Sequence, residues 1–168
     1  SFMSQKLRVA LVRGPIVFID GSQNNEATPA IGLAYLASYI RSRGYDPIII
    51  DAIGEGINHC WPIKNYLGFS CQGLLFDTII EKIPKNSDVI GFSGMFSGEW
   101  PLQKILIRQI RENFLKALIV AGGEHITAHT EFSLRECPSI DVCVRGERET
   151  IFYELLETYG ETGGYNNV

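Results

Sequence analysis

The chain has 168 residues, of which 45% are hydrophobic and 20% charged, a composition typical of one globular domain that excludes a disordered chain. Its net charge of −4 is spread along the sequence, which excludes the clustered basic surface that nucleic-acid binding requires. No apolar run is long enough to span a membrane, and residues 1–6 lack the features of a signal peptide. We therefore expect a cytoplasmic protein in which residues 1–6 are a tag or a disordered start.

Five short apolar runs alternate with helical patterns, which indicates βαβ units and a parallel sheet. The expected strands are Leu7–Val12, Pro47–Asp51, Asp88–Ser93, Ala117–Ala121 and Ile140–Val144. The expected helices are Pro29–Arg43, which Gly44 stops, then Gly73–Ile83, Pro101–Phe114, Thr130–Glu136 and Glu147–Tyr159. Because crossovers between parallel strands are right-handed, we predict a three-layer α/β fold. It is a Rossmann-like (flavodoxin-like) open sheet of strand order 2-1-3-4-5 with helices on both faces.

The segments after the strands are the candidate ligand site, because open α/β sheets bind ligands beyond the carboxyl ends of their strands. The first, Arg13–Ser22, is expected to be a long loop without the glycine fingerprint of a dinucleotide site. Asp51 could bind a ribose, although a loop cap explains it better. Small and polar residues follow the other strands, and glycine lets a ligand approach the backbone closely. The candidate cofactor-binding residues are Arg13, Gly14, Ser93, Gly94, Met95, Phe96, Gly122, Gly123, Glu124, His125, Arg145, Gly146 and Glu147.

Other chemistries are disfavoured by missing motifs. The sequence has no nucleophile elbow, no Walker loop and no metalloprotease motif, which argues against a hydrolase or an NTPase. A receiver domain needs acidic residues where Arg13 and Ser93 stand. His125 and His129 lie in an expected loop and the four cysteines lack metal-binding spacing, so we expect no metal site and reduced thiols.

Four motifs in register resemble one family, the N-terminal cobalamin-binding domain of radical S-adenosylmethionine enzymes, whose members include methyltransferases and magnesium-protoporphyrin monomethyl ester cyclases. The motifs are Pro29–Ile40, Asp88–Ser93, Gly122–Thr127 and Asp141–Glu147. The resemblance implies that the corrin lies across the carboxyl ends of the strands and that its nucleotide tail enters a channel lined by small residues. It also implies that Met95 stands where the family has leucine, a substitution that conserves volume.

Two departures from the family pattern shape the expected function. The loop after the first strand lacks the motif that supplies a lower axial histidine, so we expect base-off cobalamin without a protein ligand. No Cys-x-x-x-Cys-x-x-Cys motif occurs, so the 4Fe-4S cluster and S-adenosylmethionine are expected in a missing C-terminal radical domain. Residues 7–159 are then the cobalamin-binding domain and 160–168 a linker. This piece is not expected to be catalytic alone, and its parent would transfer a methyl group or carry out a cyclase-type oxidation.

Three hypotheses follow. The first is a cobalamin-binding module, for which leucine in place of Gly122 or Gly123 should abolish cobalamin uptake and leave the fold intact. The second is an interaction domain that has lost the cofactor and docks the radical domain. The third, a flavin-binding domain, is disfavoured because the loop after the first strand is too apolar to hold a phosphate. The aromatic segment 54–72 could cover the corrin or meet the partner domain.

Overall fold

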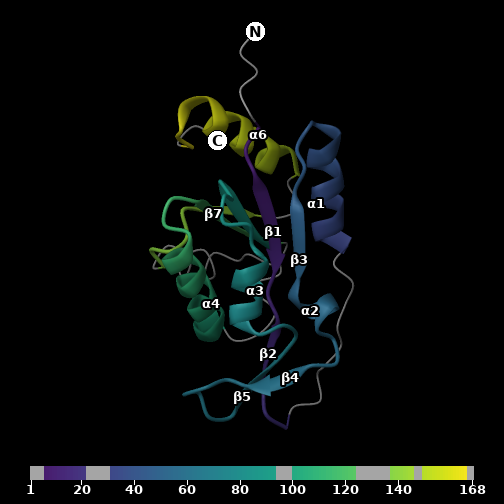
Figure 1. Ribbon diagram of the computed structural model, residues 1–168, viewed down its shortest axis with the longest axis vertical. Coiled ribbons are helices and arrows are strands. Elements are labelled where there is room, and N and C mark those ends of the chain that lie inside the picture. The colour runs from purple at the N-terminus through teal and green to yellow at the C-terminus, as the bar shows by residue number, and fades with distance from the viewer. Residues whose placement is uncertain (1–5, 22–30, 94–99, 124–136, 146–148, 166–168) are drawn as a thin grey trace.

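Five parallel strands form one twisted sheet in the computed structural model, which describes residues 6–21, 31–93, 100–123, 137–145 and 149–165 (Figure 1). The spatial order is β3-β1-β6-β7-β8. The strands are β1 (Val9–Arg13), β3 (Ile48–Asp51), β6 (Val89–Ser93), β7 (Leu118–Gly123) and β8 (Val142–Arg145). Counted along the chain without the other strands, this order is the predicted 2-1-3-4-5, which is confirmed.

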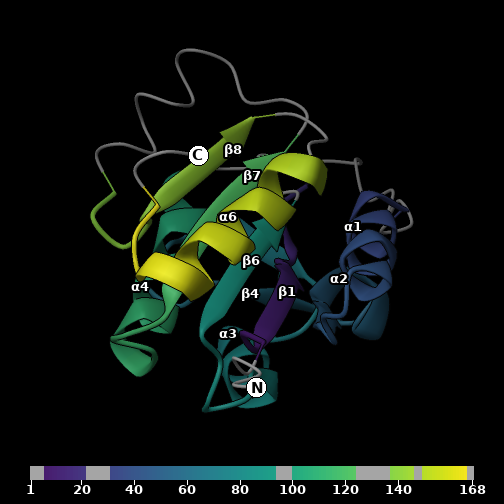
Figure 2. The ribbon, with the colours of Figure 1, turned by 90° about the horizontal axis from the view of Figure 1, so that it is seen from above.

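Helices cover both faces of this sheet (Figures 1 and 2). Successive strand residues point to opposite faces, so Leu11 packs with α1 (Ile31–Ser42) and α6 (Glu149–Thr162), whereas Val12 packs with α3 (Phe76–Lys82) and α4 (Trp100–Asn113). Both strand residues are fully buried. The predicted three-layer architecture is therefore confirmed, with a hydrophobic core on each side of the sheet.

The helix ends follow local backbone chemistry. Gly44 has a φ of 95° and its N–H donates to the Arg41 carbonyl, while the Tyr45 N–H donates to the Ile40 carbonyl. This is a Schellman cap, which confirms Gly44 as the stop signal. Helix α3 begins at Phe76 rather than at Gly73, since Gly73 has a φ of 135° that no helix accommodates. Helix α6 continues three residues beyond the expected Tyr159, and the expected helix 130–136 lies outside the described residues.

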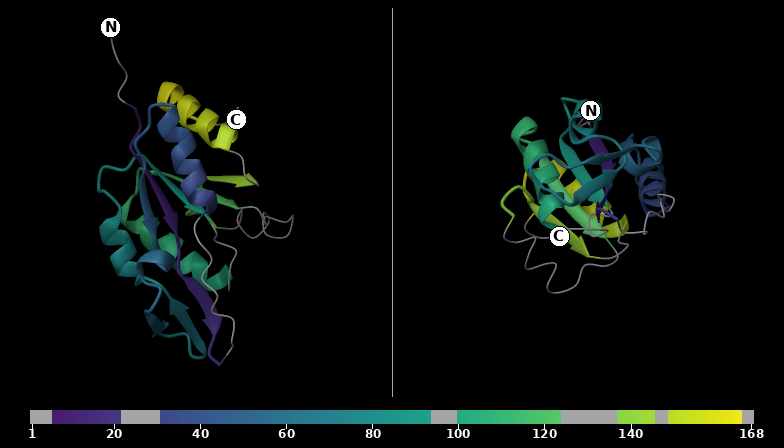
Figure 3. Two further views of the ribbon diagram at one scale, coloured as in Figure 1. Left: turned by 90° about the vertical axis from the view of Figure 1, so that its right-hand side faces the viewer. Right: turned by 90° about the horizontal axis from the view of Figure 1, so that it is seen from below.

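A second, antiparallel sheet was not predicted. Its order is β2-β5-β4, formed by Ile16–Ile19, Phe69–Gln72 and Cys60–Pro62. The expectation of a loop after the first strand was thus wrong for residues 16–19, and segment 54–72 holds two strands besides the end of the short helix α2 (Ala52–Glu55). This sheet lies beyond the carboxyl ends of β1 and β3, at the opposite end of the molecule from α6 (Figures 1 and 3).

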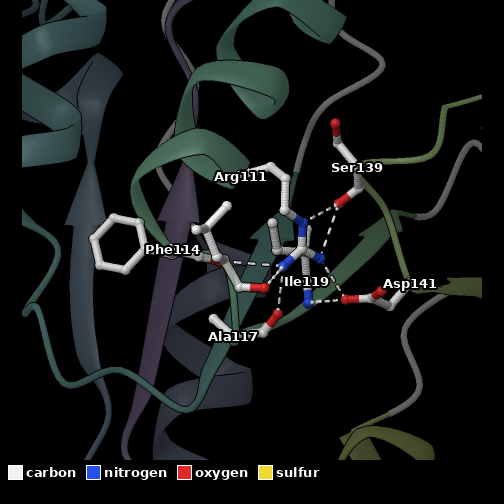
Figure 4. A network of polar contacts seen from close by, with 7 residues as sticks. Arg111, Phe114, Ala117, Ile119, Ser139 and Asp141 are labelled. Atoms are coloured by element: carbon white, nitrogen blue, oxygen red, sulfur yellow. Dashed lines mark hydrogen bonds and ion pairs between the residues drawn. The ribbon is translucent and has the colours of Figure 1, made fainter.

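The amino-terminal edge of the parallel sheet is fastened by Arg111 near the end of α4 (Figure 4). Its guanidinium donates to the carbonyls of Phe114, Leu115, Ala117 and Ser139, and Nη2 lies 2.6 Å from Asp141 Oδ2. The same Asp141 oxygen accepts the Ile119 N–H at 2.8 Å. One side chain therefore joins the end of α4 to the starts of β7 and β8.

A second polar contact at this end of the molecule joins α6 to the segments that precede β1 and follow α1. Glu157 Oε1 accepts hydrogen bonds from Lys6 Nζ at 2.9 Å and from the Tyr45 hydroxyl at 2.8 Å. The Lys6 and Tyr45 hydrogen bonds lower the pKa of Glu157. Burial, followed by the Glu157 carboxylate, raises the pKa of Tyr45. Within the described ranges, every helix is too short or too polar to cross a bilayer.

Candidate functional site

The carboxyl edge of the parallel sheet brings together candidate residues from four strands. Arg13 is paired in register with Asp51 on one side and with Ser93 on the other. Ser93 is paired with Gly122, and Gly123 with Arg145 on β8. Residues that are up to 132 positions apart in sequence thus form one row, as the strand pattern predicted. Outside the described residues lie Gly94, Met95, Phe96, Glu124, His125, Gly146 and Glu147, which stay predictions.

Arg13 is held by a two-pronged ion pair. Its Nε lies 2.7 Å from Asp51 Oδ1 and its Nη2 lies 2.9 Å from Asp51 Oδ2, and Arg13 is only 7% exposed. Asp51 also accepts the Gly54 N–H at the start of α2, which is the capping role preferred over ribose binding. The pair places an oriented, largely buried guanidinium at the edge where the strand order reverses.

Gly14 lies directly against α4. A Cβ at this buried position would lie 3.4 Å from both Gln103 Oε1 and Leu106 Cδ2, which are side-chain atoms of that helix. Gln103 is itself 3% exposed and its Nε2 donates to the Pro15 carbonyl at 3.4 Å. The end of β1 therefore packs directly against α4 at Gly14, where a Cβ would lie at the limit of an ordinary contact.

Two strand glycines also have structural roles. A Cβ at Gly91 would lie 3.1 Å from Leu11 Cδ2 and 3.4 Å from the Phe152 ring, so Gly91 makes room for α6 rather than for a ligand. A Cβ at Gly122 would lie 3.2 Å from the Val144 carbonyl oxygen, which is tighter than an ordinary contact. Hence the expectation that leucine at Gly122 leaves the fold intact needs a stability control.

Gln72, the last residue of β5, is a feature that the sequence analysis missed. It is 8% exposed, and its Nε2 donates to the Ile57 carbonyl at 2.8 Å. Its Oε1 is buried and has no hydrogen-bond partner among the described residues. A single glutamine in an aromatic segment carries no sequence signal for such a position.

The cysteines are separate thiols. All four lie in the described ranges, and none forms a disulfide. Cys71 on β5 is fully buried, and burial raises the pKa of its thiol to about 12. Among the described side chains, no group of three or more His, Cys, Asp or Glu is placed to hold a metal ion.

Comparison with known families shows that residues 25–156 match the B12 binding domain. An uncharacterised methyltransferase of Pyrococcus horikoshii is 34% identical over 132 residues, which cover 77% of this chain and 24% of that protein. Cytidylyl-2-hydroxyethylphosphonate methyltransferase of Streptomyces wedmorensis is 28% identical, over 77% of this chain and 24% of that protein. Anaerobic magnesium-protoporphyrin IX monomethyl ester cyclase of Rubrivivax gelatinosus is also 28% identical, over 76% of this chain and 20% of that protein. The chain thus spans a quarter or less of the length of these relatives.

Solved structures support the fold alone. A putative pilus assembly-related protein of Burkholderia pseudomallei superposes with a TM-score of 0.54 at 10% identity, over 96% of this chain and 95% of that one. A CheY-like receiver domain protein of Methanospirillum hungatei superposes with a TM-score of 0.51 at 14% identity, over 94% of this chain and 99% of that one. Both similarities agree with the flavodoxin-like strand order.

Proposed function

Because the chain belongs to the B12-binding domain family, we propose that it is the cobalamin-binding module of a larger radical S-adenosylmethionine enzyme. The observation that carries the proposal is the family match over residues 25–156, which includes the row of candidate residues at the carboxyl edge. The relatives are methyltransferases and a cyclase several times longer than this chain. The parent protein would accordingly transfer a methyl group or carry out a cyclase-type oxidation, using a radical domain outside this chain.

Two features of the described residues suit a corrinoid. Ser93, Gly122 and Gly123 place little side-chain bulk at adjacent strand ends, so backbone and a hydroxyl meet the ligand there. The buried Gln72 Oε1 is an acceptor without a partner among the residues that the structure describes, and corrinoids carry amide donors. Ser93, Gly122, Gly123 and Gln72 would hold the cofactor together with Arg145. The predicted residues of the same site are Gly94, Met95, Phe96, Glu124, His125, Gly146 and Glu147.

The part of this chain in the chemistry is to bind and orient the cofactor. Cobalamin, when bound, supplies a cobalt centre that carries a methyl group or takes part in a radical step. Arg13 is fixed by Asp51 at the strand switch point, so the position of its guanidinium does not depend on the ligand. We further propose that the cobalamin is base-off with no axial histidine from this chain, and that the 4Fe-4S cluster and S-adenosylmethionine belong to the radical domain. The cytoplasmic location stays a prediction.

The alternative is a domain of the same fold that docks the radical domain without cofactor. The absence of an axial-histidine motif from the sequence after the first strand favours it. Titration of the chain with hydroxocobalamin distinguishes the two hypotheses. Binding is monitored by the visible spectrum and by co-elution on gel filtration. Binding at tens of micromolar supports the module, and no bound corrinoid at that concentration supports the docking domain.

A matched pair of variants locates the binding. Ser93→Leu adds bulk at the carboxyl edge, whereas Ser87→Leu makes the same change at a half-buried serine just before β6, near the amino edge. We expect Ser93→Leu to lose hydroxocobalamin binding and Ser87→Leu to keep it. Thermal melting of both variants checks that the difference does not come from unfolding.

A further inference from the structure

The buried side chain of Gln72 has a hydrogen-bond partner, among the described residues, for only one of its two polar atoms. Its Nε2 donates to the Ile57 carbonyl, but its Oε1 is buried without a partner among the described residues. Buried side-chain oxygens in proteins are nearly always paired, because a lost hydrogen bond to water is not otherwise replaced. A glutamine kept in this state indicates that a donor arrives from outside the described chain.

The side chain lies on the face of β5 that the core does not use. Successive strand residues point to opposite faces, and Cys71 packs into the core cluster that also contains Val17 and Phe76. Gln72 therefore points to the other face of the β2-β5-β4 sheet, as does Ser70. Because Oε1 is buried and Nε2 is held by the Ile57 carbonyl, Oε1 reaches a donor on that face only when the amide turns about its soft terminal torsion.

This position adjoins the carboxyl edge. Gln72 is paired with Ile16, three residues beyond the end of β1. A Cβ on the next residue, Gly73, would lie 2.6 Å from the Ala52 carbonyl oxygen and 2.9 Å from Pro15 Cβ. Residues 72 and 73 thus lie directly against the segments that follow β1 and β3, and the second sheet projects past these strand ends (Figure 3). A flat ligand on the carboxyl edge would meet this sheet as a side wall.

The charges near Gln72 indicate which part of a ligand could contact its Oε1. Among the described residues, acidic side chains near this end of the second sheet include Asp51, Glu55 and Asp20, and Asp51 is paired with Arg13. Glu55 is paired with Lys82, and Asp20 accepts the hydroxyl of Ser70. A carbonyl acceptor beside these paired carboxylates suits an N–H donor and disfavours a phosphate. The periphery of the corrin ring carries primary amides, which are such donors.

Building on the proposed function, we propose that Gln72 Oε1 accepts a hydrogen bond from a peripheral amide of the corrin ring, and that the β2-β5-β4 sheet is the side wall of the cofactor site. Segment 54–72 then contacts the corrin from the side. This role concerns binding and orientation only, and involves no covalent step.

The test compares two probes, dicyanocobinamide, whose periphery carries amides, and the dicyano heptamethyl ester of cobyrinic acid, whose periphery does not. Affinities are measured by visible titration for the unchanged chain, Gln72→Met and the control Gln109→Met, a half-buried glutamine of α4 far from the edge. We expect Gln72→Met to weaken cobinamide binding about five- to tenfold, and to leave ester binding unchanged. Gln109→Met should alter neither affinity.

Equal losses for both probes, or no loss, in Gln72→Met would overturn the assignment of Gln72 and leave the proposed function standing. If the unchanged chain binds none of the three ligands, namely the two probes and hydroxocobalamin, the proposed function is overturned instead. Gln72→Leu removes the same acceptor and replaces the methionine variant if that one does not fold, as judged by thermal melting.

Discussion

Arg13 and Asp51 are the last residues of two neighbouring parallel strands, and their side chains form an ion pair through two hydrogen bonds, of 2.7 Å and 2.9 Å. Two charge-assisted hydrogen bonds between one guanidinium and one carboxylate are stronger and more specific in direction than a single one. Because Asp51 also caps α2, one carboxylate fixes β1, β3 and the chain that leads toward the second sheet. The candidate site is thereby built on a rigid edge.

Breaking this pair should destabilise the fold. Asp51→Asn removes the carboxylate charge and leaves Arg13 largely buried, so we expect a loss of about 2 kcal/mol, less than for a fully buried pair because the Asp51 side chain is 22% exposed. Asp46→Asn, at an exposed aspartate, is the control and should stay within about 0.5 kcal/mol. Urea denaturation measures both, and equal midpoints would contradict a structural role for the pair.

Arg111 should matter for stability and not for ligand binding. Arg111→Met removes the hydrogen bonds that join α4 to β7 and β8, and we expect a loss of about 2–3 kcal/mol in the free energy of unfolding. Arg108→Met makes the same change at an exposed arginine of the same helix and should cost little. Since Arg111 is at the amino edge, the folded variant should bind hydroxocobalamin like the unchanged chain. Weakened binding would place the site elsewhere.

Alanine in place of Gly91 should lower the stability of the fold, whereas alanine in place of Gly160 should raise it. The new Cβ at Gly91 would press on Leu11 and Phe152, and overpacking of this kind costs about 1–3 kcal/mol. At Gly160, near the end of α6, the new Cβ would meet Leu7 at an ordinary 3.7 Å, so alanine should stabilise by about 0.5 kcal/mol. Thermal melting compares the two. A neutral Gly91→Ala would contradict the packing role assigned to Gly91.

Acid should weaken the contact that Glu157 of α6 makes with Lys6 and Tyr45. The hydrogen bonds from Lys6 and Tyr45 hold the pKa of Glu157 below its ordinary value of 4.5. A lowered pKa in the folded state means that the stabilisation is fully present above pH 4.5 and is lost as the pH falls below it. The stability difference between the unchanged chain and Glu157→Gln should therefore shrink between pH 5 and pH 3 in urea titrations. A difference that stays constant over this range would contradict the assignment.

The parallel sheet was predictable because its signals are local. Apolar runs such as residues 88–93 mark strands buried on both faces, and Gly44 marks a helix end by backbone conformation. The right-handed crossover rule then leaves few strand orders. With the order known, Arg13, Ser93 and Gly122 had to meet at one edge, as they do.

The second sheet was not predictable by the same means. Its strands are three or four residues long, too short for alternation to show, and β2 is paired with residues about fifty positions away. The packing role of Gly91 could not be predicted for a related reason, since only the tertiary structure shows that Phe152 packs over it. Gln72 combines both difficulties, because its importance depends on a non-local strand and on an oxygen without a partner.

The central claim is that this chain binds cobalamin at the carboxyl edge of its parallel sheet. Two-dimensional NMR of the 15N-labelled chain during titration with hydroxocobalamin tests it directly. We predict that the backbone amides of Ser93, Gly122, Gly123 and Arg145 shift, while those of Asp88, Leu118 and Asp141 at the amino edge do not. Unchanged spectra, or shifts confined to the amino edge, would contradict the claim.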